Sequence, residues 1–247
     1  MTTSHPGTVG ILGGMGPAAG ADFARLFVQA CDSLLKARGG PVNDQAFPEH
    51  WLVQVPVPDR TAALLDGGAT PLPGMVAALR RLASLGAKSV AMACNTAHAW
   101  HEELQRSCPE LELLHIVKQT AQQLANDRVD AVGLIATLGT HRTGLYETVL
   151  ERSGIRCYAP RPEEQVQVMR GILEGVKGGN LPLARECFEQ VAQQLVQRHG
   201  VSTLVLACTE IPLVLRTLPG YLEVRLVDPA DVLARALAER AYACTGD

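Results

Sequence analysis

Residues 90–98 read VAMACNTAH, and residues 204–212 read LVLACTEIP. Each stretch is a short apolar run followed by Ala-Cys and a small polar residue, which is the pattern of a buried parallel strand. Open α/β sheets bind their ligands beyond the carboxyl ends of such strands. We therefore expect Cys94 and Cys208 to face each other across one substrate.

The composition restricts the class of protein. The 247 residues suit two small α/β domains or one large one, and a hydrophobic content of 47% supplies a full core. A net charge of −3 without a basic stripe argues against a nucleic-acid or membrane-surface partner. No apolar run is long enough to span a bilayer, and the N-terminal residues lack the pattern of a signal peptide. We expect a cytoplasmic protein that binds a small molecule.

The cysteines do not suggest a disulfide framework. They occur at positions 31, 94, 108, 157, 187, 208 and 244, an odd number without a CxxC pair. Five of the seven are expected to be small apolar residues of the core or surface.

Apolar runs alternate with amphipathic segments, which predicts a parallel α/β fold. Strands are expected at residues 9–12, 51–55, 90–93, 113–116, 129–135, 155–158, 204–207 and 224–227. Helices are expected at about 17–36, from 73 to 85, after Cys94, and at 118–126, 140–152, 163–176, 181–199 and 229–242.

A glycine-rich turn, GGMG at 13–16, follows the first strand and precedes Pro17. Proline suits the first turn of a helix, and the glycines let the backbone present N–H groups at a helix end that attracts anions. Since neither GxGxxG nor a GK[ST] ending is present, carboxylate binding is favoured over nucleotide binding. Met15 and Gly16 are thus candidate substrate contacts.

Two basic residues are candidate carboxylate ligands. Arg60 follows Asp59 in a rigid loop, where it is either a solvated charge paired with Asp59 or a bidentate carboxylate clamp. Lys177 follows the predicted helix 163–176, where interaction with the helix dipole is the ordinary explanation. The local sequence leaves both alternatives open.

A metal site is not favoured. His98, His101 and Glu102 lie on the helix expected after Cys94, but HExxH is not met and no third ligand is close. His98 could serve as the general base of a Cys-His nucleophile, which is a secondary hypothesis. Asn95 or Thr96 is expected to cap this helix.

The two halves of the chain align with each other. VGIL at 9–12 matches VGLI at 132–135, an offset of 123 positions (132 − 9). The offset is 114 between Cys94 and Cys208 (208 − 94) and 117 between Arg60 and Lys177 (177 − 60). These similar offsets predict two homologous α/β domains related by a pseudo-two-fold axis. Each domain would supply one thiol and one cation to a shared cleft.

Two acid/base groups on opposite faces of one carbon can invert its configuration. Thiols suit this role if one is a thiolate, which requires a lowered pKa, and helix N-termini after the cysteines would favour it. The developing carbanion needs hydrogen-bond donors around the α-carboxylate. The further candidate substrate contacts are Asn95, Thr96, Thr137, Gly139, Thr140, Thr209 and Glu210.

Several motifs resemble those of the aspartate/glutamate racemase family. They are GILGGMGP at 10–17, PDRT at 58–61, CNTAH at 94–98 and CTEIP at 208–212, and VMRGILEGVK at 168–177 is similar to the aspartate racemase branch. The resemblance covers nearly the whole chain. It implies an α/β fold of two pseudo-symmetric flavodoxin-like domains, each a four-stranded parallel sheet flanked by helices, with the active site in the cleft between them.

The resemblance also implies an activity, the PLP-independent two-base racemisation of an acidic amino acid, with aspartate first and glutamate second. Cys94 and Cys208 would be the catalytic thiol/thiolate pair, and Arg60 and Lys177 would bind carboxylates. No cofactor or metal is implied, and a homodimer is expected. The domains would be 1–117 plus 228–247, with a returning C-terminal helix, and 118–227.

Two other function classes stay open. One is a different enzyme of the superfamily, such as a maleate cis-trans isomerase, a decarboxylase or a hydantoin racemase, and the other is a non-catalytic amino-acid-binding protein. The chain also departs from the family pattern. Gly20 replaces a common threonine, which we expect to change packing, and Gln54 or Val55 replaces a common Asn or Ser, which could alter selectivity.

Overall fold

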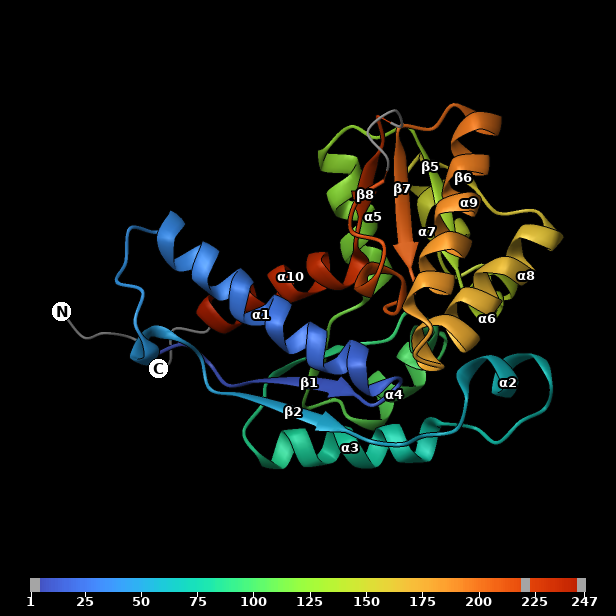
Figure 1. Ribbon diagram of the computed structural model, residues 1–247. Helices are drawn as coiled ribbons and strands as arrows, with labels where there is room; N and C mark the ends of the chain where they lie inside the picture. Colours follow the sequence, from blue (N-terminus) through green and yellow to red (C-terminus); the bar gives the residue numbers. More distant parts are fainter. Residues whose placement is uncertain (1–4, 219–222, 244–247) are drawn as a thin grey trace.

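The computed structural model describes residues 5–218 and 223–243, which form two parallel sheets (Figure 1). The first half contains β1 (Val9–Gly13), β2 (His50–Gln54), β3 (Ser89–Met92) and β4 (Glu112–Leu113), in the order β2-β1-β3-β4. The second half contains β5 (Ala131–Ala136), β6 (Arg156–Tyr158), β7 (Thr203–Ala207) and β8 (Arg225–Val227), in the order β6-β5-β7-β8. The matching orders confirm the predicted pair of four-stranded parallel sheets. Cys244 lies outside the described residues.

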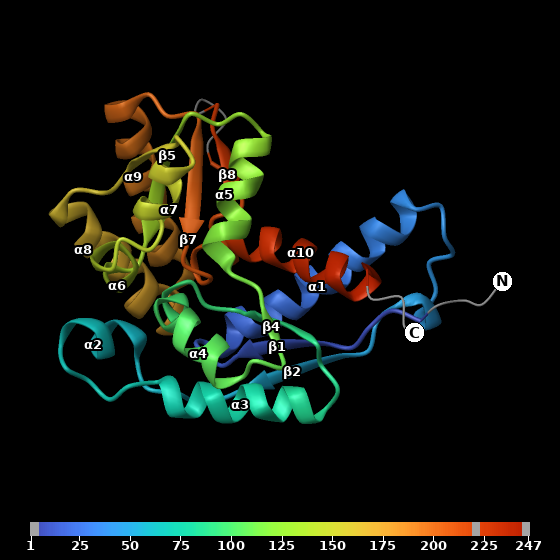
Figure 2. The same cartoon turned by 180° about the vertical axis from the view of Figure 1, so that it is seen from behind.

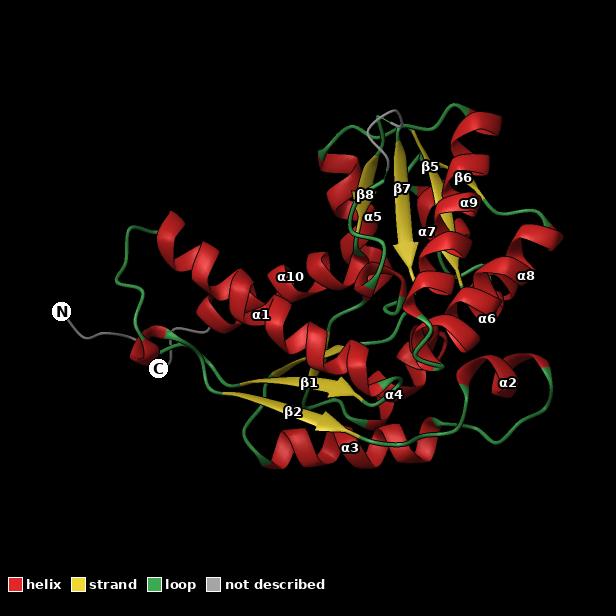
Figure 3. Cartoon of the chain, viewed as in Figure 1, coloured by secondary structure: helices red, strands yellow, loops and turns green. Residues whose placement is uncertain are grey.

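Helices flank both sheets (Figures 2 and 3). The first half carries α1 (Pro17–Ala37), α2 (Arg60–Leu65), α3 (Leu72–Ser84) and α4 (His101–Ser107). The second half carries α6 (Leu138–Arg142), α7 (Glu147–Arg152), α8 (Pro162–Arg170) and α9 (Leu181–His199). Two more helices are α5 (Ile116–Asn126), which lies between the halves in the sequence, and α10 (Pro229–Ala243), which follows β8 and packs against elements of both halves. In both views α10 runs beside α1, against which it packs.

The central strands are apolar because both of their faces are buried. Every residue of β1 and of β7 is buried, as in parallel sheets covered by helices on both sides. One apolar core spans the two halves and includes Ile11, Leu134 and Leu237. Two further cores cover the opposite faces of the sheets. The shared core holds the strand ends of the two halves together.

Four segments differ from the sequence-based prediction. The expected strand 113–116 is only two residues long, because α5 already begins at Ile116. The expected helix 140–152 is interrupted at Gly144, whose φ of +60° leaves the helical region, so α6 and α7 are separate. The expected helix 163–176 changes at Gly171 into a π-helix, Gly171–Lys177. Arg60, expected in a loop, begins α2.

The two departures from the family pattern lie next to each other. A Cβ atom at Gly20 would lie 2.5 Å from Oε1 of Gln54. Glycine at this position of α1 therefore makes room for the glutamine side chain of β2. Neither residue lines the candidate site.

Candidate active site

A cavity of about 300 Å³ lies between the two halves, where the carboxyl ends of β1, β3, β5 and β7 converge. Both Cys94 and Cys208 line it, so the two thiols predicted to share a substrate do share a cavity. The other predicted contacts that line the cavity are Met15, Arg60, Asn95, Thr96, Thr137, Lys177, Thr209 and Glu210.

Three predicted contacts, Gly16, Gly139 and Thr140, are not among the residues that line the cavity. Gly139 is packed against Thr61, whose Oγ1 atom would be 3.0 Å from an added Cβ atom. The Thr140 backbone N–H, expected to bind a carboxylate, instead donates to Oγ1 of Thr137 at 3.2 Å. A Cβ atom at Gly16 would lie 3.2 Å from Oε1 of Glu210, so glycine at this position leaves room for the Glu210 side chain.

Sequence reasoning missed a group of lining residues on α2 and its two caps, at the end of α8 and on the π-helix. Its members are Asp59, Thr61, Ala62, Asp66, Met169, Ile172 and Leu173. The sequence predicts a loop at 58–61 and an ordinary helix at 163–176, and neither pattern indicates side chains that face a cavity. The π-helix is packed closely on α9, since a Cβ atom at Gly175 would lie 2.6 Å from Cβ of Ala184. Glycines four positions apart, at 171 and 175, were the available signal.

Arg60 is a buried cation, 8% exposed. Its Nη2 atom donates to the Met15 carbonyl at 2.6 Å, and its Nη1 atom donates to the Pro58 carbonyl at 3.1 Å. Asp59 instead caps α2 by accepting from the Ala62 N–H at 2.9 Å. The alternative that Arg60 is a solvated loop charge paired with Asp59 is therefore wrong. The Nε atom of Arg60 has no hydrogen-bond partner among the described residues.

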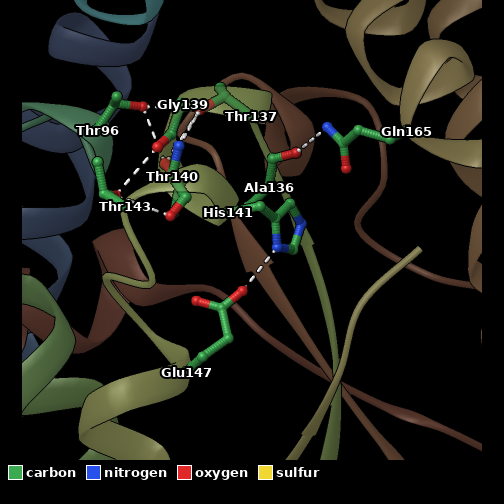
Figure 4. Close-up of polar contacts among 9 residues, drawn as sticks. All are labelled: Thr96, Ala136, Thr137, Gly139, Thr140, His141, Thr143, Glu147 and Gln165. Atoms are coloured by element: carbon green, nitrogen blue, oxygen red, sulfur yellow. Dashed lines mark hydrogen bonds and ion pairs between the residues drawn. The ribbon is translucent and has the colours of Figure 1, made fainter. Parts of the chain in front are cut away.

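Hydroxyl groups from both halves meet at the cavity wall (Figure 4). Oγ1 of Thr96 lies 2.9 Å from Oγ1 of Thr137 and 3.0 Å from Oγ1 of Thr140, and the last two are 3.0 Å apart. Thr209 makes the reciprocal contact and donates to the Ala93 carbonyl at 3.5 Å. The Thr96 side chain therefore contacts the second half of the molecule and does not cap a helix. The Asn95 side chain makes no capping hydrogen bond either.

His98 contacts the backbone at Cys94 and not the thiol. Its Nδ1 atom lies 2.9 Å from the Cys94 carbonyl oxygen, and burial lowers its pKa to about 4. Such a ring stays neutral and supports the strand end, which removes the basis for a Cys-His nucleophile. Across the described ranges 5–218 and 223–243, no cluster of three or more His, Cys, Asp or Glu side chains is arranged to hold a metal ion.

Cys208 has a different partner. Its Sγ atom donates to Oε2 of Glu210 at 3.0 Å, and both side chains are buried. Lys177 forms an ion pair with the other carboxylate oxygen, Oε1, at 3.8 Å. Lys177 therefore lines the cavity and pairs with a particular carboxylate, which a simple interaction with the helix dipole does not explain.

Neither thiol has the lowered pKa that was expected. Burial raises the pKa of Cys94, although the positive charge of Arg60 opposes this. The pKa of Cys208 lies well above its usual value because burial and the negative charge of Glu210 act in the same direction. The structural segments after the cysteines are short 3-10 turns, Thr96–Trp100 and Ile211–Leu213, and their N–H groups do not outweigh desolvation.

The fold and the cavity together define an α/β protein with two matched halves and two thiols in one site. Residues 12–237 match the model of the Asp/Glu/Hydantoin racemase family. The chain therefore belongs to this family.

Individual relatives agree with this assignment. The chain is similar to the broad specificity amino-acid racemase RacX of Bacillus subtilis, with 24% identity over 92% of this chain and 95% of that protein. The Picrophilus torridus aspartate racemase structure has 29% identity and a TM-score of 0.79, covering 95% of this chain and 94% of that chain. Glutamate racemase of Francisella tularensis has 18% identity and a TM-score of 0.59, covering 96% of this chain and 80% of that chain, and it shares the fold.

No helix in the described part of the chain is long and apolar enough to cross a membrane.

Proposed function

We propose that this protein racemises an acidic amino acid without PLP, aspartate first and glutamate second, through Cys94 and Cys208. One observation carries the proposal: the two thiols follow equivalent strands, β3 and β7, and line one cavity. One thiolate removes the α-proton and the other thiol returns a proton to the opposite face. Since the thiols exchange roles, the reaction has no net redox or cofactor requirement.

The cations support an acidic substrate. Arg60 has a buried guanidinium with hydrogen-bonding capacity left beyond its two backbone bonds, which suits a carboxylate. Lys177 is a second cation in the same cavity. A carbanion next to a carboxylate would be stabilised by Asn95 and by the threonine hydroxyls at the cavity wall.

Deuterium exchange tests the proposal. Purified protein in D2O is incubated with D- and L-aspartate, D- and L-glutamate and neutral amino acids, and α-deuterium and enantiomer ratios are measured. We expect both enantiomers of aspartate to exchange and to racemise. If no substrate incorporated α-deuterium and no enantiomer ratio changed, racemisation would be rejected. Maleate turnover without aspartate turnover would identify a different enzyme of the superfamily, and binding without turnover a non-catalytic protein.

A second candidate is racemisation of a wider range of amino acids. Met169, Ile172 and Leu173 form an apolar part of the cavity wall, and a relative aligned over most of the chain is a broad specificity racemase. The neutral amino acids in the same exchange experiment distinguish the two candidates.

We further propose the domain division 1–117 plus 228–247 and 118–227, a homodimer, and a cytoplasmic location. The packing of α10 against α1 supports the first of these. Light scattering of the purified protein tests the dimer.

A further inference from the structure

The two thiols of the cavity are chemically unequal, although the strands that carry them are equivalent. Cys208 donates its S–H hydrogen to Oε2 of Glu210 at 3.0 Å. Glu210 is 5% exposed, so its charge is poorly screened by water. A thiolate at Cys208 would lie directly against this carboxylate.

Lys177 forms an ion pair with the carboxylate oxygen of Glu210 that Cys208 does not use. Its Nζ atom lies 3.8 Å from Oε1, which leaves Oε2 for the thiol. In this arrangement Cys208 is the proton donor and Oε2 of Glu210 the acceptor. Thr209 lies beside the same oxygen, with its hydroxyl 3.5 Å from Oε2, and adds no charge.

Cys94 has the opposite electrostatic neighbour. The buried guanidinium of Arg60, which is held by two backbone carbonyl groups, interacts favourably with a negative charge on Cys94. Glu210 opposes the ionisation of Cys94 as well, but its effect on the pKa of Cys94 is smaller than that of Arg60 and involves no hydrogen bond. The other acidic residues that line the cavity are Asp59 and Asp66, on the α2 side.

We propose that Glu210 holds the proton on Cys208 in the substrate-free enzyme, so that Cys94 is the thiol that ionises first. This assignment rests on the proposed function for its role in turnover and gives Glu210 a task other than binding substrate. The Cys94 thiolate takes the α-proton, forming an S–H bond and leaving the Cα–H electron pair on the substrate. Cys208 then gives its proton to the opposite face and becomes a thiolate. The enzyme resets when Cys208 takes a proton from water and Cys94 releases one.

Thiol labelling tests the assignment without any substrate. The folded protein is exposed to iodoacetamide at neutral pH, and labelling of each cysteine is followed by peptide mass spectrometry. Access does not bias the comparison, because Cys94 is 6% and Cys208 5% exposed. We expect Cys94 to react first, by at most roughly tenfold for each unit by which the two pKa values differ, because the nucleophilicity of a thiolate falls with its pKa. Faster labelling of Cys208 would overturn the proposal.

Glu210→Gln provides the second arm. It keeps the size of the side chain and removes the charge, so Cys208 should gain reactivity relative to Cys94. Glu164→Gln is the matched control, since Glu164 is 4% exposed and paired with Arg198 outside the cavity. An unchanged labelling ratio in Glu210→Gln would overturn the proposal.

A third arm needs no change at Glu210. Ultraviolet absorbance of the thiolate is titrated in Cys208→Ser, which keeps Cys94, and in Cys94→Ser, which keeps Cys208. We expect the first variant to ionise at lower pH than the second, and the reverse order would refute the assignment. Because none of these measurements uses an amino acid, they are independent of the deuterium exchange that tests the proposed function.

Discussion

The Tyr146 hydroxyl donates a hydrogen bond to Oδ1 of Asn95 at 2.5 Å, across 51 positions of sequence. Tyr146 belongs to the second half and is fully buried, whereas Asn95 follows Cys94 in the first half. The bond therefore fixes the orientation of a cavity-lining amide from the opposite half of the molecule.

Tyr146→Phe should remove this constraint. The Asn95 oxygen would lose its only described partner while buried, which costs about 1–3 kcal/mol of unfolding free energy. We expect a lower racemisation rate as well, measured together with denaturant unfolding. Tyr158→Phe is the control, because within the described part of the chain the Tyr158 hydroxyl makes one long contact, with Arg156 at 3.5 Å. An equal loss in both variants would contradict a specific role of Tyr146.

Under the proposed function, Cys94 and Cys208 should each be indispensable for racemisation. In Cys94→Ala and in Cys208→Ala one face of the substrate loses its proton carrier, so conversion between enantiomers should fall to background. One-sided exchange of the α-proton with D2O can survive in one of the variants. Cys108→Ala removes a buried thiol outside the cavity and should leave racemisation intact. Normal racemisation by either active-site variant would refute the pairing.

Arg60→Lys should weaken substrate binding although the charge is kept. A lysine has no planar fork with which to hold both the Met15 and Pro58 carbonyl groups and a carboxylate. Loss of a charged hydrogen bond of about 1.5–3 kcal/mol predicts a roughly 10- to 100-fold rise in KM for aspartate. Arg185→Lys, at an exposed ion pair with Glu189, should not change KM. Equal KM values for wild type and Arg60→Lys would argue against a carboxylate clamp.

Stability should rise with pH between about 4 and 6.5. Burial lowers the pKa of His98 to about 4 and that of His115 to about 3, so the unfolded chain binds protons that the folded protein does not. Asp228 has the opposite effect, because burial raises its pKa to about 6 and the folded protein binds the extra proton. Two histidines less one aspartate leave a difference of one proton, or about 1.4 kcal/mol per pH unit, and His101, whose pKa burial also lowers, adds to this slope.

Urea unfolding at several pH values measures this slope. Asp228→Asn should steepen it, since the variant removes the opposing titration while asparagine can still accept the Ala230 N–H bond at the start of α10. A stability that falls as pH rises from 4.5 to 6 would contradict the neutral state of the buried histidines.

Gly175→Ala should disturb the π-helix that carries Lys177. The added Cβ atom would lie 2.6 Å from Cβ and 2.8 Å from Cα of Ala184, so the helix must move away from α9. We expect a loss of about 1–3 kcal/mol in stability and a higher KM, because Lys177 shifts relative to Glu210. Gly40→Ala is the control, since its nearest neighbour would be the Leu35 carbonyl oxygen at 3.8 Å. A variant as stable and active as Gly40→Ala would show that the close packing has no such role.

The sequence was sufficient for the two sheets and for the pair of cysteines. Buried parallel strands are continuous apolar runs, and the Ala-Cys ends of β3 and β7 repeat visibly along the chain. A strand pattern also predicts which end of the sheet holds the ligand, and the sequence alone therefore places Cys94 and Cys208 at that end.

The surroundings of these thiols depended on tertiary contacts. Burial and distant partners set the ionisation of Cys208 and the pairing of Lys177 with Glu210, and neither can be read from neighbours in the chain. The expected thiolate-favouring helix ends proved weaker than desolvation for the same reason. Local sequence specifies where a functional group is attached to the backbone, whereas its charge state and its partners follow from what the folded chain packs around it.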